Sequence, residues 1–283
     1  MTYRELYLQG QEALKRADIE EASLDARLLL EYVCGTTRNE LLLGGEREVT
    51  EGQTAQYLHF IGSRAKHIPL QHLTGTQNFM GLDFKVNEHV LIPRQDTEIL
   101  VEEAMKHLHD GMRILDMCTG SGCILISLLH YSNDCTGVGV DISAEALTVA
   151  RENADRLLKG KAEKISFVES DLFEDVEGQF DLLVSNPPYI CSKVIETLMP
   201  EVREHEPLSA LDGTEDGLYF YRRIVAESGK YLVPGGVLIF EIGYDQGQAV
   251  SDLMIQAGYR EVQVLQDYAG LDRVVCGIKS FRK

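Results

Sequence analysis

From about residue 99 onward, short apolar runs that suit β-strands alternate with longer segments that suit α-helices. This alternation predicts a mostly parallel sheet with helices on both faces, because parallel strands need a crossover connection between them. The expected strands are 113–117, 137–140, 165–168, 180–185, 237–241, 262–265 and 273–278, and helices include 144–158 and 218–232. Too few residues separate the last two strands for a helix, so we expect that pair to be antiparallel. The fold class is α/β.

The N-terminal part of the chain is expected to be entirely helical. Three segments have the spacing of a capping box, in which a side chain and the backbone satisfy one another at a helix start, and they begin at Thr2, Thr37 and Thr50. Apolar side chains recur every four residues at Leu24, Leu28 and Tyr32, and Gly35 then provides a stop. These signals predict a small helical bundle.

Residues 73–92 have a different character, with aromatic and β-branched side chains on both sides of Gly81. This pattern is typical of a short β-hairpin. We therefore expect a helical domain at residues 1–72, a hairpin connector at 73–92 and an α/β domain at 93–283. A separate helical domain beside an enzyme-like α/β domain is a natural place for contacts with a large substrate.

A glycine turn follows the first strand of the α/β domain. It consists of Cys118, Thr119, Gly120, Ser121 and Gly122 and leads directly into a helix. Backbone N–H groups at a helix N-terminus can cradle a ligand, and glycine leaves room for its approach. Leu125 stands where a dinucleotide-binding fingerprint has its third glycine, which disfavours NAD. Asp116, just before the turn, either contacts the ligand or stabilises the turn.

Two acidic residues end the next two strands. Asp141 lies about 20 residues beyond the turn, where a carboxylate can bind both ribose hydroxyls of an adenosine ligand. The alternative role for Asp141 is to cap the following helix, although Ser143 is better placed for that. Asp171 and Leu172 follow the third strand and are expected to border an adenine ring.

The sequence Asn186-Pro187-Pro188-Tyr189 follows the strand 180–185, at the edge of the sheet where ligands bind in open α/β folds. Asn186 offers a side-chain acceptor, and the prolines leave backbone carbonyls without a local donor. Tyr189 supplies a flat apolar wall. The four residues suit a planar –NH2 group, and we expect Asn186, Pro187 and Tyr189 to act on it with Pro188 as a second wall.

Composition excludes several other functions. The formal charge of −18 opposes a surface that grips nucleic acid by its phosphates, so direct nucleic-acid binding is not expected. The six cysteines are scattered without metal-ligand spacing, which favours reduced thiols and no metal site. No apolar run reaches membrane-spanning length and the first residues are charged. We expect a soluble, cytoplasmic protein with no membrane partner.

These motifs together resemble the class I S-adenosylmethionine-dependent methyltransferases, whose fold is a Rossmann-like, seven-stranded, mostly parallel sheet. Three segments are similar to the release factor glutamine methyltransferases (PrmC/HemK family): residues 91–98 to I-P-R-P-[DE]-T-E, residues 186–190 to N-P-P-Y-I, and residues 206–218 to E-P-x-x-A-L-x-G-G-x-D-G-L. This chain departs from the family pattern at Gln95, Cys118 and Thr214, where the family usually has Pro, Gly and Gly.

The resemblance implies methyl transfer from S-adenosylmethionine to the glutamine of the Gly-Gly-Gln loop in class-1 peptide-chain release factors. Asn186 Oδ1 and the Pro187 carbonyl would then accept the two amide N–H bonds, and no strong base is required. Arg94 either supports the substrate loop or the cofactor, or forms only a surface ion pair. Three alternatives remain: methylation of a ribosomal-protein glutamine, methylation of adenine N6 in DNA, and a non-catalytic cofactor-binding module.

Overall fold

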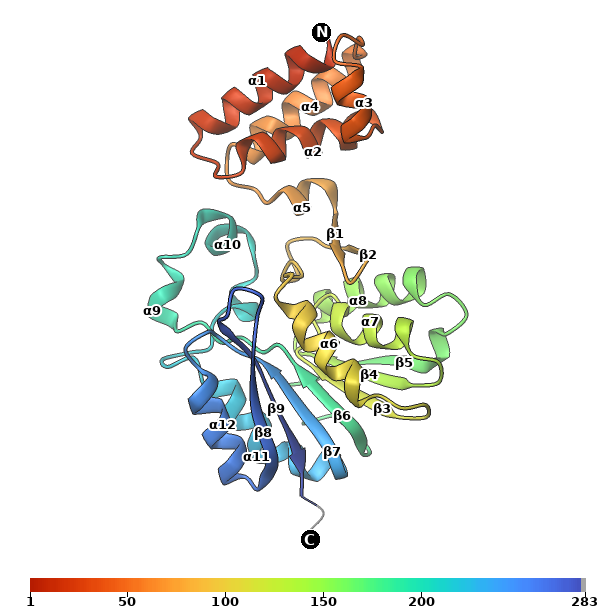
Figure 1. The fold of residues 1–283 in the computed structure, drawn as a ribbon, viewed down its shortest axis with the longest axis vertical. Coiled ribbons are helices and arrows are strands. Elements are labelled where there is room, and N and C mark those ends of the chain that lie inside the picture. Colours follow the sequence, from red (N-terminus) through yellow and green to blue (C-terminus); the bar gives the residue numbers. More distant parts are fainter. Residues whose placement is uncertain (281–283) are drawn as a thin grey trace. The chain divides into compact units, whose positions relative to one another are not determined.

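Seven strands form one mixed sheet, which confirms the predicted α/β fold (Figure 1). Their bounds are β3 Arg113–Met117, β4 Thr136–Asp141, β5 Ile165–Glu169, β6 Phe180–Ser185, β7 Leu232–Glu241, β8 Tyr259–Gln266 and β9 Asp272–Lys279. The order across the sheet is β5-β4-β3-β6-β7-β9-β8. Strand β9 pairs antiparallel with both β7 and β8, as expected for the last pair, and the other pairings are parallel. The computed structural model describes residues 1–280.

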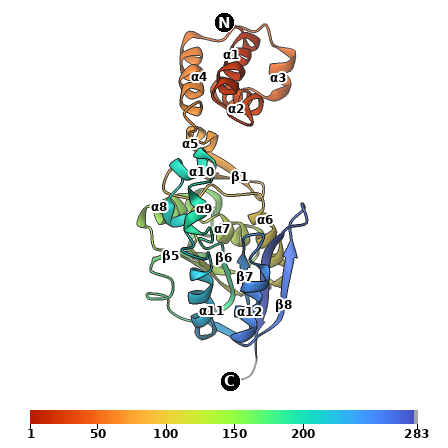
Figure 2. The same ribbon diagram turned by 90° about the vertical axis from the view of Figure 1, so that its left-hand side faces the viewer.

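Side chains from successive strand residues enter two different cores, one on each face of the sheet. In β6, Leu182 and Val184 belong to one core cluster and Leu183 to the other, as the two-residue period of a strand requires. Helices α6 (Thr97–His107), α7 (Cys123–Tyr131) and α8 (Ala144–Leu157) cover the first face, and α11 (Tyr219–Tyr231) and α12 (Gly247–Gln256) cover the second (Figures 1 and 2). The sheet is therefore buried on both faces, which explains its continuous apolar runs.

The expected hairpin consists of β1 (Thr76–Phe79) and β2 (Leu82–Lys85). Its turn places Gly81 at a φ of 73°, in the left-handed region that glycine tolerates. Phe79 and Phe84 are fully buried in the first core cluster, where their rings meet edge to face. The hairpin is thus part of the α/β core, although the sequence indicated only a connector.

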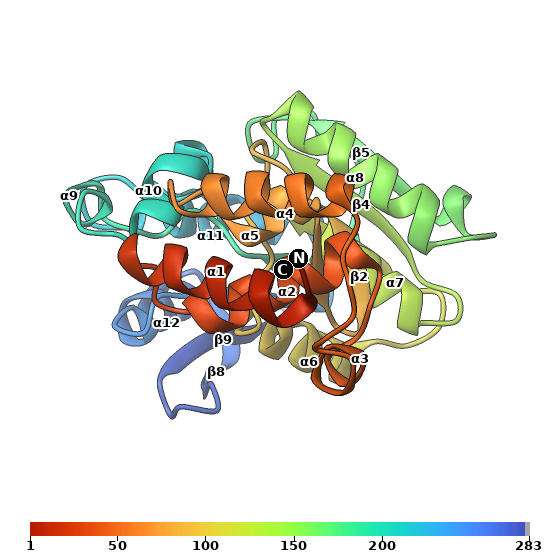
Figure 3. The same ribbon diagram turned by 90° about the horizontal axis from the view of Figure 1, so that it is seen from above.

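The N-terminal helices form a compact unit of their own, which comprises Met1–Thr76 together with Met199–His205. The helices are α1 Tyr3–Arg16, α2 Ala22–Cys34, α3 Arg38–Leu43, α4 Glu51–Arg64 and α5 Leu70–Thr74, and the three capping boxes are present at Thr2, Thr37 and Thr50. Helices α1, α2 and α4 pack side by side (Figure 3). The core lies between them, and Tyr57 fills it next to Gly10, where a Cβ would come within 2.0 Å of the Tyr57 hydroxyl oxygen.

The apolar row on α2 correctly predicts a helix but does not form its buried face. Leu24 and Tyr32 are 39% and 49% exposed, whereas Leu29 and Leu30 are fully buried. A four-residue period identifies a helix without showing which side has a partner. The helical unit therefore exposes Leu24 and Tyr32 of this row, while Leu28 between them is half-buried.

Helix α10 (Pro200–His205) packs within the helical unit although it lies far along the chain, after the N-P-P-Y motif. The contact is ionic, because Arg64, which is 7% exposed, binds Asp25 Oδ2 at 2.7 Å and Glu201 Oε1 at 2.9 Å. His67 Nδ1 lies 3.2 Å from the same Glu201 oxygen. Nothing in the sequence pattern indicated this association. Within residues 1–280, no helix is long and apolar enough to cross a membrane.

Candidate active site

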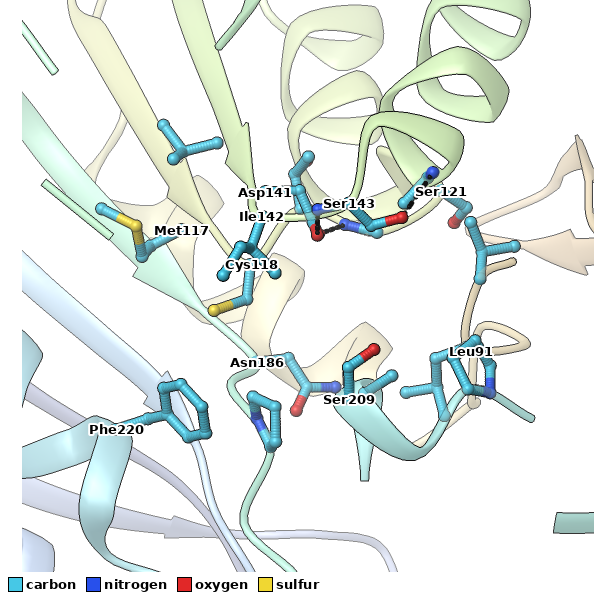
Figure 4. Close-up of a pocket in the computed structure, with 18 of the residues that line it drawn as sticks. Leu91, Met117, Cys118, Ser121, Asp141, Ile142, Ser143, Asn186, Ser209 and Phe220 are labelled. Carbon is cyan, nitrogen blue, oxygen red and sulfur yellow. Dashed lines mark hydrogen bonds between the residues drawn. The ribbon is translucent and has the colours of Figure 1, made fainter. Parts of the chain in front are cut away.

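A cavity of about 480 Å³ opens at the C-terminal ends of the parallel strands, within the size range of small-molecule sites (Figure 4). It lies entirely in the second compact unit, made of Gln77–Leu198 and the chain from Glu206 onward. Most of the residues singled out in the sequence line it: Cys118, Thr119, Gly120, Ser121, Asp141, Asp171, Leu172, Asn186 and Pro188. Among the described residues, Gly122, Pro187 and Tyr189 lie outside this lining.

The glycine turn connects β3 to α7 through an unusual run of backbone conformations. Cys118, Gly120 and Gly122 have φ values of 62°, 55° and 79°, all in the left-handed region. A Cβ on Gly120 would meet no atom within 4 Å, so this glycine borders open space. The turn can therefore approach a ligand through its backbone, as a helix N-terminus that binds ligands requires.

Asp116 lies beneath this turn and is completely buried. Its Oδ2 accepts a hydrogen bond from Thr119 Oγ1 at 2.6 Å. Burial raises the pKa of Asp116 to about 7, and the bonds from the Thr119 hydroxyl and the Leu125 amide oppose that rise. Asp116 does not line the cavity, so its contacts favour the turn-stabilising role over ligand contact.

Asp141 lies at the end of β4 and connects the turn to the next helix (Figure 4). Its Oδ2 accepts from the Gly120 amide at 2.8 Å and its Oδ1 from the Ser143 amide at 3.0 Å. Ser143 caps α8 by accepting from the Ala146 amide, as expected from the sequence. Each carboxylate oxygen has a second lone pair, so Asp141 can still accept from two hydroxyls of a ligand.

Asp171 and Leu172 form the next part of the cavity wall, beyond the end of β5. Asp171 Oδ1 pairs with Arg223 of α11 at 2.8 Å, which holds the carboxylate against the helix. Leu172 is 4% exposed and has a φ of 55°, a strained conformation for a leucine. The backbone at this point is therefore held firmly beside the cavity.

Asn186 borders the cavity on the side opposite Asp141 (Figure 4). Its Nδ2 donates to Thr97 Oγ1 at 3.4 Å. Among the described residues, neither Asn186 Oδ1 nor the Pro187 carbonyl accepts a hydrogen bond. Just before Asn186, Ser185 Oγ donates to the Met117 carbonyl at 2.6 Å and ties the end of β6 to β3. Of the two acceptors predicted from the sequence, Asn186 Oδ1 borders the cavity and is available to an external –NH2 group, whereas the buried Pro187 lies outside the lining.

The ring of Tyr189 reaches a buried carboxyl group behind the cavity. Its hydroxyl donates to Glu241 Oε1 at 3.3 Å, and Glu241 is 2% exposed. Burial raises the pKa of Glu241 to about 7, while the Thr97 hydroxyl, Arg273 and Tyr189 lower it. Burial also raises the pKa of Tyr189, and the buried Glu241 and the hydrogen bond to it act in the same direction. Tyr189 is held by its hydroxyl and does not turn that group to the cavity.

Arg94 is paired with a buried partner. It donates to Glu206, whose side chain is 1% exposed, while the Arg94 side chain is 40% exposed and lines the cavity. Burial raises the pKa of Glu206, and the Arg94 charge opposes this. The pair connects two segments that are 112 residues apart, which favours the substrate-loop role for Arg94 over a simple surface ion pair.

Several other lining residues were not among the site residues predicted from the sequence. Leu91, Thr97, Ser143, Ser209, Ala210 and Phe220 line the cavity as well. Four of them lie in the two segments that resemble the family pattern, Leu91 and Thr97 in 91–98 and Ser209 and Ala210 in 206–218. Ser143 was predicted only as a helix cap, and Phe220 only as part of a helix. Within residues 1–280, no cluster of three or more side chains could hold a metal ion.

Comparison with known proteins agrees with this geometry. The PrmC N-terminal domain matches residues 5–75, and the methyltransferase small domain matches residues 94–201. A release factor glutamine methyltransferase from Caulobacter vibrioides is 42% identical to this chain, covering 99% of it and 97% of the relative. Another, from Moorella thermoacetica, is 44% identical and covers 96% and 97%. The chain belongs to the release factor glutamine methyltransferases.

A methyltransferase from Pyrococcus furiosus has the same fold as this family member, with a TM-score of 0.52 at 17% identity over 82% of this chain and all of that one. The family resemblance seen in the sequence is confirmed by the two full-length relatives. At two of the three departures from the family pattern the structure explains why glycine is usual, and nothing in it explains Gln95. Cys118 and Thr214, which occupy usual glycine positions, have φ values of 62° and 71°. These are the conformations that glycine adopts without strain.

Proposed function

We propose that this enzyme transfers a methyl group from S-adenosylmethionine to the side-chain amide nitrogen of the glutamine in the Gly-Gly-Gln loop of class-1 release factors. The supporting observation is that Asp141 and Asn186 face one cavity from opposite sides, with their remaining acceptor capacity available. The release factor activity named for the relatives agrees with this assignment.

The residues present fit the cofactor. Asp141 can accept from two ribose hydroxyls while it keeps its bonds to the turn, and the open backbone at Gly120 leaves room beside it. Asp171 and Leu172 would border the base. When bound, S-adenosylmethionine supplies an electrophilic methyl group on a sulfonium centre.

The opposite side would hold the acceptor. An amide –NH2 has two N–H bonds, and Asn186 Oδ1 and the Pro187 carbonyl offer two acceptors. Accepting from both bonds fixes the nitrogen and increases its electron density. Pro188 and Tyr189 restrict the space around the amide plane. Well-aligned reacting groups gain roughly 7–11 kcal/mol relative to free encounter, so orientation can supply much of the rate. The N-methyl amide can lose its extra proton after transfer.

Recognition of an intact release factor needs more than a pocket for one side chain. We assign this role to residues 1–72, which we treat as a substrate-recognition domain, with 73–92 as the connector and 93–283 as the methyltransferase domain. The exposed row at Leu24 and Tyr32 supports this, because apolar side chains at a contact surface gain free energy when buried. Replacing both residues by Ser should raise the KM for intact release factor several-fold and leave cofactor affinity unchanged.

The direct test is transfer of tritium from labelled S-adenosylmethionine to purified release factor, ribosomes and DNA in parallel. We expect label on the release factor, and none when its Gly-Gly-Gln glutamine is replaced by Ala. Labelling of a ribosomal protein alone would indicate the sister glutamine activity. Labelling of DNA alone would indicate an adenine methyltransferase, and cofactor binding without any transfer would indicate a non-catalytic module.

A further inference from the structure

The side-chain amide of Gln246 is buried behind the cavity, and both its nitrogen and its oxygen form hydrogen bonds. Gln246 precedes α12 and is 8% exposed. Its Nε2 donates to the Tyr189 carbonyl at 3.0 Å and to the Gly217 carbonyl at 3.2 Å. Its Oε1 accepts from the Gly243 amide at 2.9 Å, and the Tyr221 hydroxyl, which donates to the Glu241 carbonyl at 2.9 Å, lies 3.4 Å from this oxygen. The Gly243 N–H can only donate and the two carbonyls can only accept, so the amide has one orientation.

Three separate segments meet at this side chain: the N-P-P-Y turn, the loop 213–217 and the turn between β7 and α12. They pack without space for side chains. A Cβ on Gly217 would lie 2.4 Å from the Tyr189 carbonyl oxygen and 2.6 Å from Gln246 Nε2. A Cβ on Gly213 would lie 2.7 Å from Tyr189 Cα. The Tyr189 backbone is therefore enclosed, and only Gln246 satisfies its carbonyl among the described residues.

The position of the Tyr189 carbonyl affects where the proposed acceptor atoms of the N-P-P-Y turn lie. Asn186 is anchored on one side, where Ser185 binds Met117, and two prolines with restricted φ angles separate it from Tyr189. Fixing the Tyr189 carbonyl at the other end therefore fixes the Pro187 carbonyl between the two anchors. A displacement of about 1 Å in such a group can cost about a hundredfold in rate.

We propose that Gln246 is a positioning residue, which sets the N-P-P-Y turn for methyl transfer by holding the Tyr189 and Gly217 carbonyls on one side-chain amide. It does not line the cavity, so it acts through the turn and not by touching substrate. This inference rests on the proposed function of that turn. Nothing in the sequence around Gln246 has the form of a motif. Its role depends on contacts with Tyr189, which is 57 positions earlier in the chain, and with Gly217, which is 29 positions earlier.

Gln246→Glu is the sharpest test. The substitution keeps the size of the side chain but replaces the donor by an oxygen that faces two carbonyls. We expect kcat on release factor at pH 8 to fall at least about tenfold, with the cofactor Kd unchanged within about twofold. At pH 6 the variant should regain part of its kcat relative to wild type, because a protonated carboxyl can donate to one carbonyl again. A purely structural role would not produce this recovery.

Gln248→Glu is the matched control, since Gln248 is exposed in the first turn of α12, two residues after Gln246, and its side chain bonds only Asp252 in the structure described. It should retain wild-type kcat at both pH values. If folded Gln246→Glu also has wild-type kcat at pH 8, the inference is wrong. If it does not fold, Gln246→Met replaces it as a length-matched variant, with the same expected loss at pH 8. Failure of both variants to fold would assign Gln246 to stability and overturn the positioning role.

Labelling by the wild-type enzyme in the same experiment distinguishes failure of this inference from failure of the proposed function. If wild type labels no release factor, the proposed substrate is wrong, and the Gln246 comparison is made on whichever parallel acceptor is labelled. If wild type labels the release factor and Gln246→Glu does so at the same rate, only the positioning role is rejected.

Discussion

The two sides of the cavity are built in different ways. On the cofactor side, Asp141 binds main-chain amides of the adjacent turn and helix, and the turn itself presents backbone. On the acceptor side, Asn186 and its neighbours depend on buried side chains from distant segments, among them Thr97, Glu241 and Gln246. The cofactor side is thus determined locally and the acceptor side by tertiary contacts. Substitutions far from the reaction should therefore impair turnover more than cofactor binding.

The largest effect is expected at Asn186, on the acceptor side. Asn186→Ala removes one of the two acceptors for the amide nitrogen, which can then rotate out of line. Loss of a positioning group of this kind costs on the order of a hundredfold or more in rate. The kcat on release factor should fall by that factor, with most of the cofactor affinity retained, as measured by single-turnover transfer and calorimetry.

Asn186→Asp provides the comparison, because it keeps an acceptor of the same shape and loses the donor to Thr97. It should retain more activity than the Ala variant and less than wild type. Equal rates for wild type and Asn186→Ala would mean that the reaction centre lies elsewhere. A parallel loss of cofactor affinity would show that the two sides are not separable.

The next largest expected effect is a dependence of the free energy of unfolding on pH. It arises from one buried carboxyl group on each side of the cavity, Asp116 on the cofactor side and Glu241 on the acceptor side. The pKa values of Asp116 and Glu241 are raised by burial from 3.8 and 4.5 to about 7. When the pKa of a carboxyl is higher in the folded state than in the unfolded state, folding is most favourable at a pH below the unfolded-state pKa. As pH rises from about 4 to about 7, the carboxyl ionises in the unfolded state before it does so in the folded state, and the free energy of unfolding falls. For Glu241 the difference corresponds to a free energy on the order of 3 kcal/mol.

Glu241→Gln and Asp116→Asn should therefore gain stability relative to wild type as pH rises through this window, as measured by denaturant unfolding at pH 5 and pH 8. A constant stability difference between variant and wild type at the two pH values would contradict the raised pKa. The functional effects should differ. Glu241→Gln should lower kcat through Tyr189, and Asp116→Asn should weaken cofactor binding through the turn.

Asp141→Ala should have a somewhat smaller effect, confined to the cofactor side. It removes charge-assisted hydrogen bonds worth about 1.5–3 kcal/mol, which corresponds to a tenfold to hundredfold weaker Kd for the cofactor. The kcat at saturating cofactor should change little. Calorimetry that shows unchanged affinity in a folded Asp141→Ala protein would reject the ribose role.

The difference between the two sides also explains what the sequence could predict. Strands, the glycine turn and Asp141 follow from local periodicity and short-range spacing, and the structure contains them within a few residues of the expected bounds. Gln246, by contrast, acquires its role only when separate segments meet. The same holds for Arg64, which recruits α10 into the helical unit, and for the exposed row at Leu24. Periodicity shows that a segment is helical, but the partner of each face depends on the tertiary fold.

The smallest effect is expected at Thr214, where the family pattern indicated glycine. Its φ of 71° is held by the Asp212 carboxylate, which accepts from the Thr214 amide at 2.8 Å, and by Ser192, whose amide donates to the Thr214 carbonyl at 2.9 Å. A β-branched residue pays about 1–2 kcal/mol in this conformation, and glycine loses about 0.5–1 kcal/mol more backbone entropy on folding. Thr214→Gly should therefore stabilise the protein by about 0.5–1 kcal/mol.

In thermal unfolding, the gain at Thr214 should appear as a Tm increase of about 1–4 °C, with Thr214→Asn between Thr and Gly because Asn tolerates positive φ. Cys118→Gly is the matching change on the cofactor side. It relieves a φ of 62° but removes a side chain that packs on the second core cluster, so its gain should be smaller. A lower Tm for Thr214→Gly would mean that the threonine side chain contributes more packing than its strained backbone costs. The loop beside Tyr189 would then be held by side chains at this position too, as the rest of the acceptor side is.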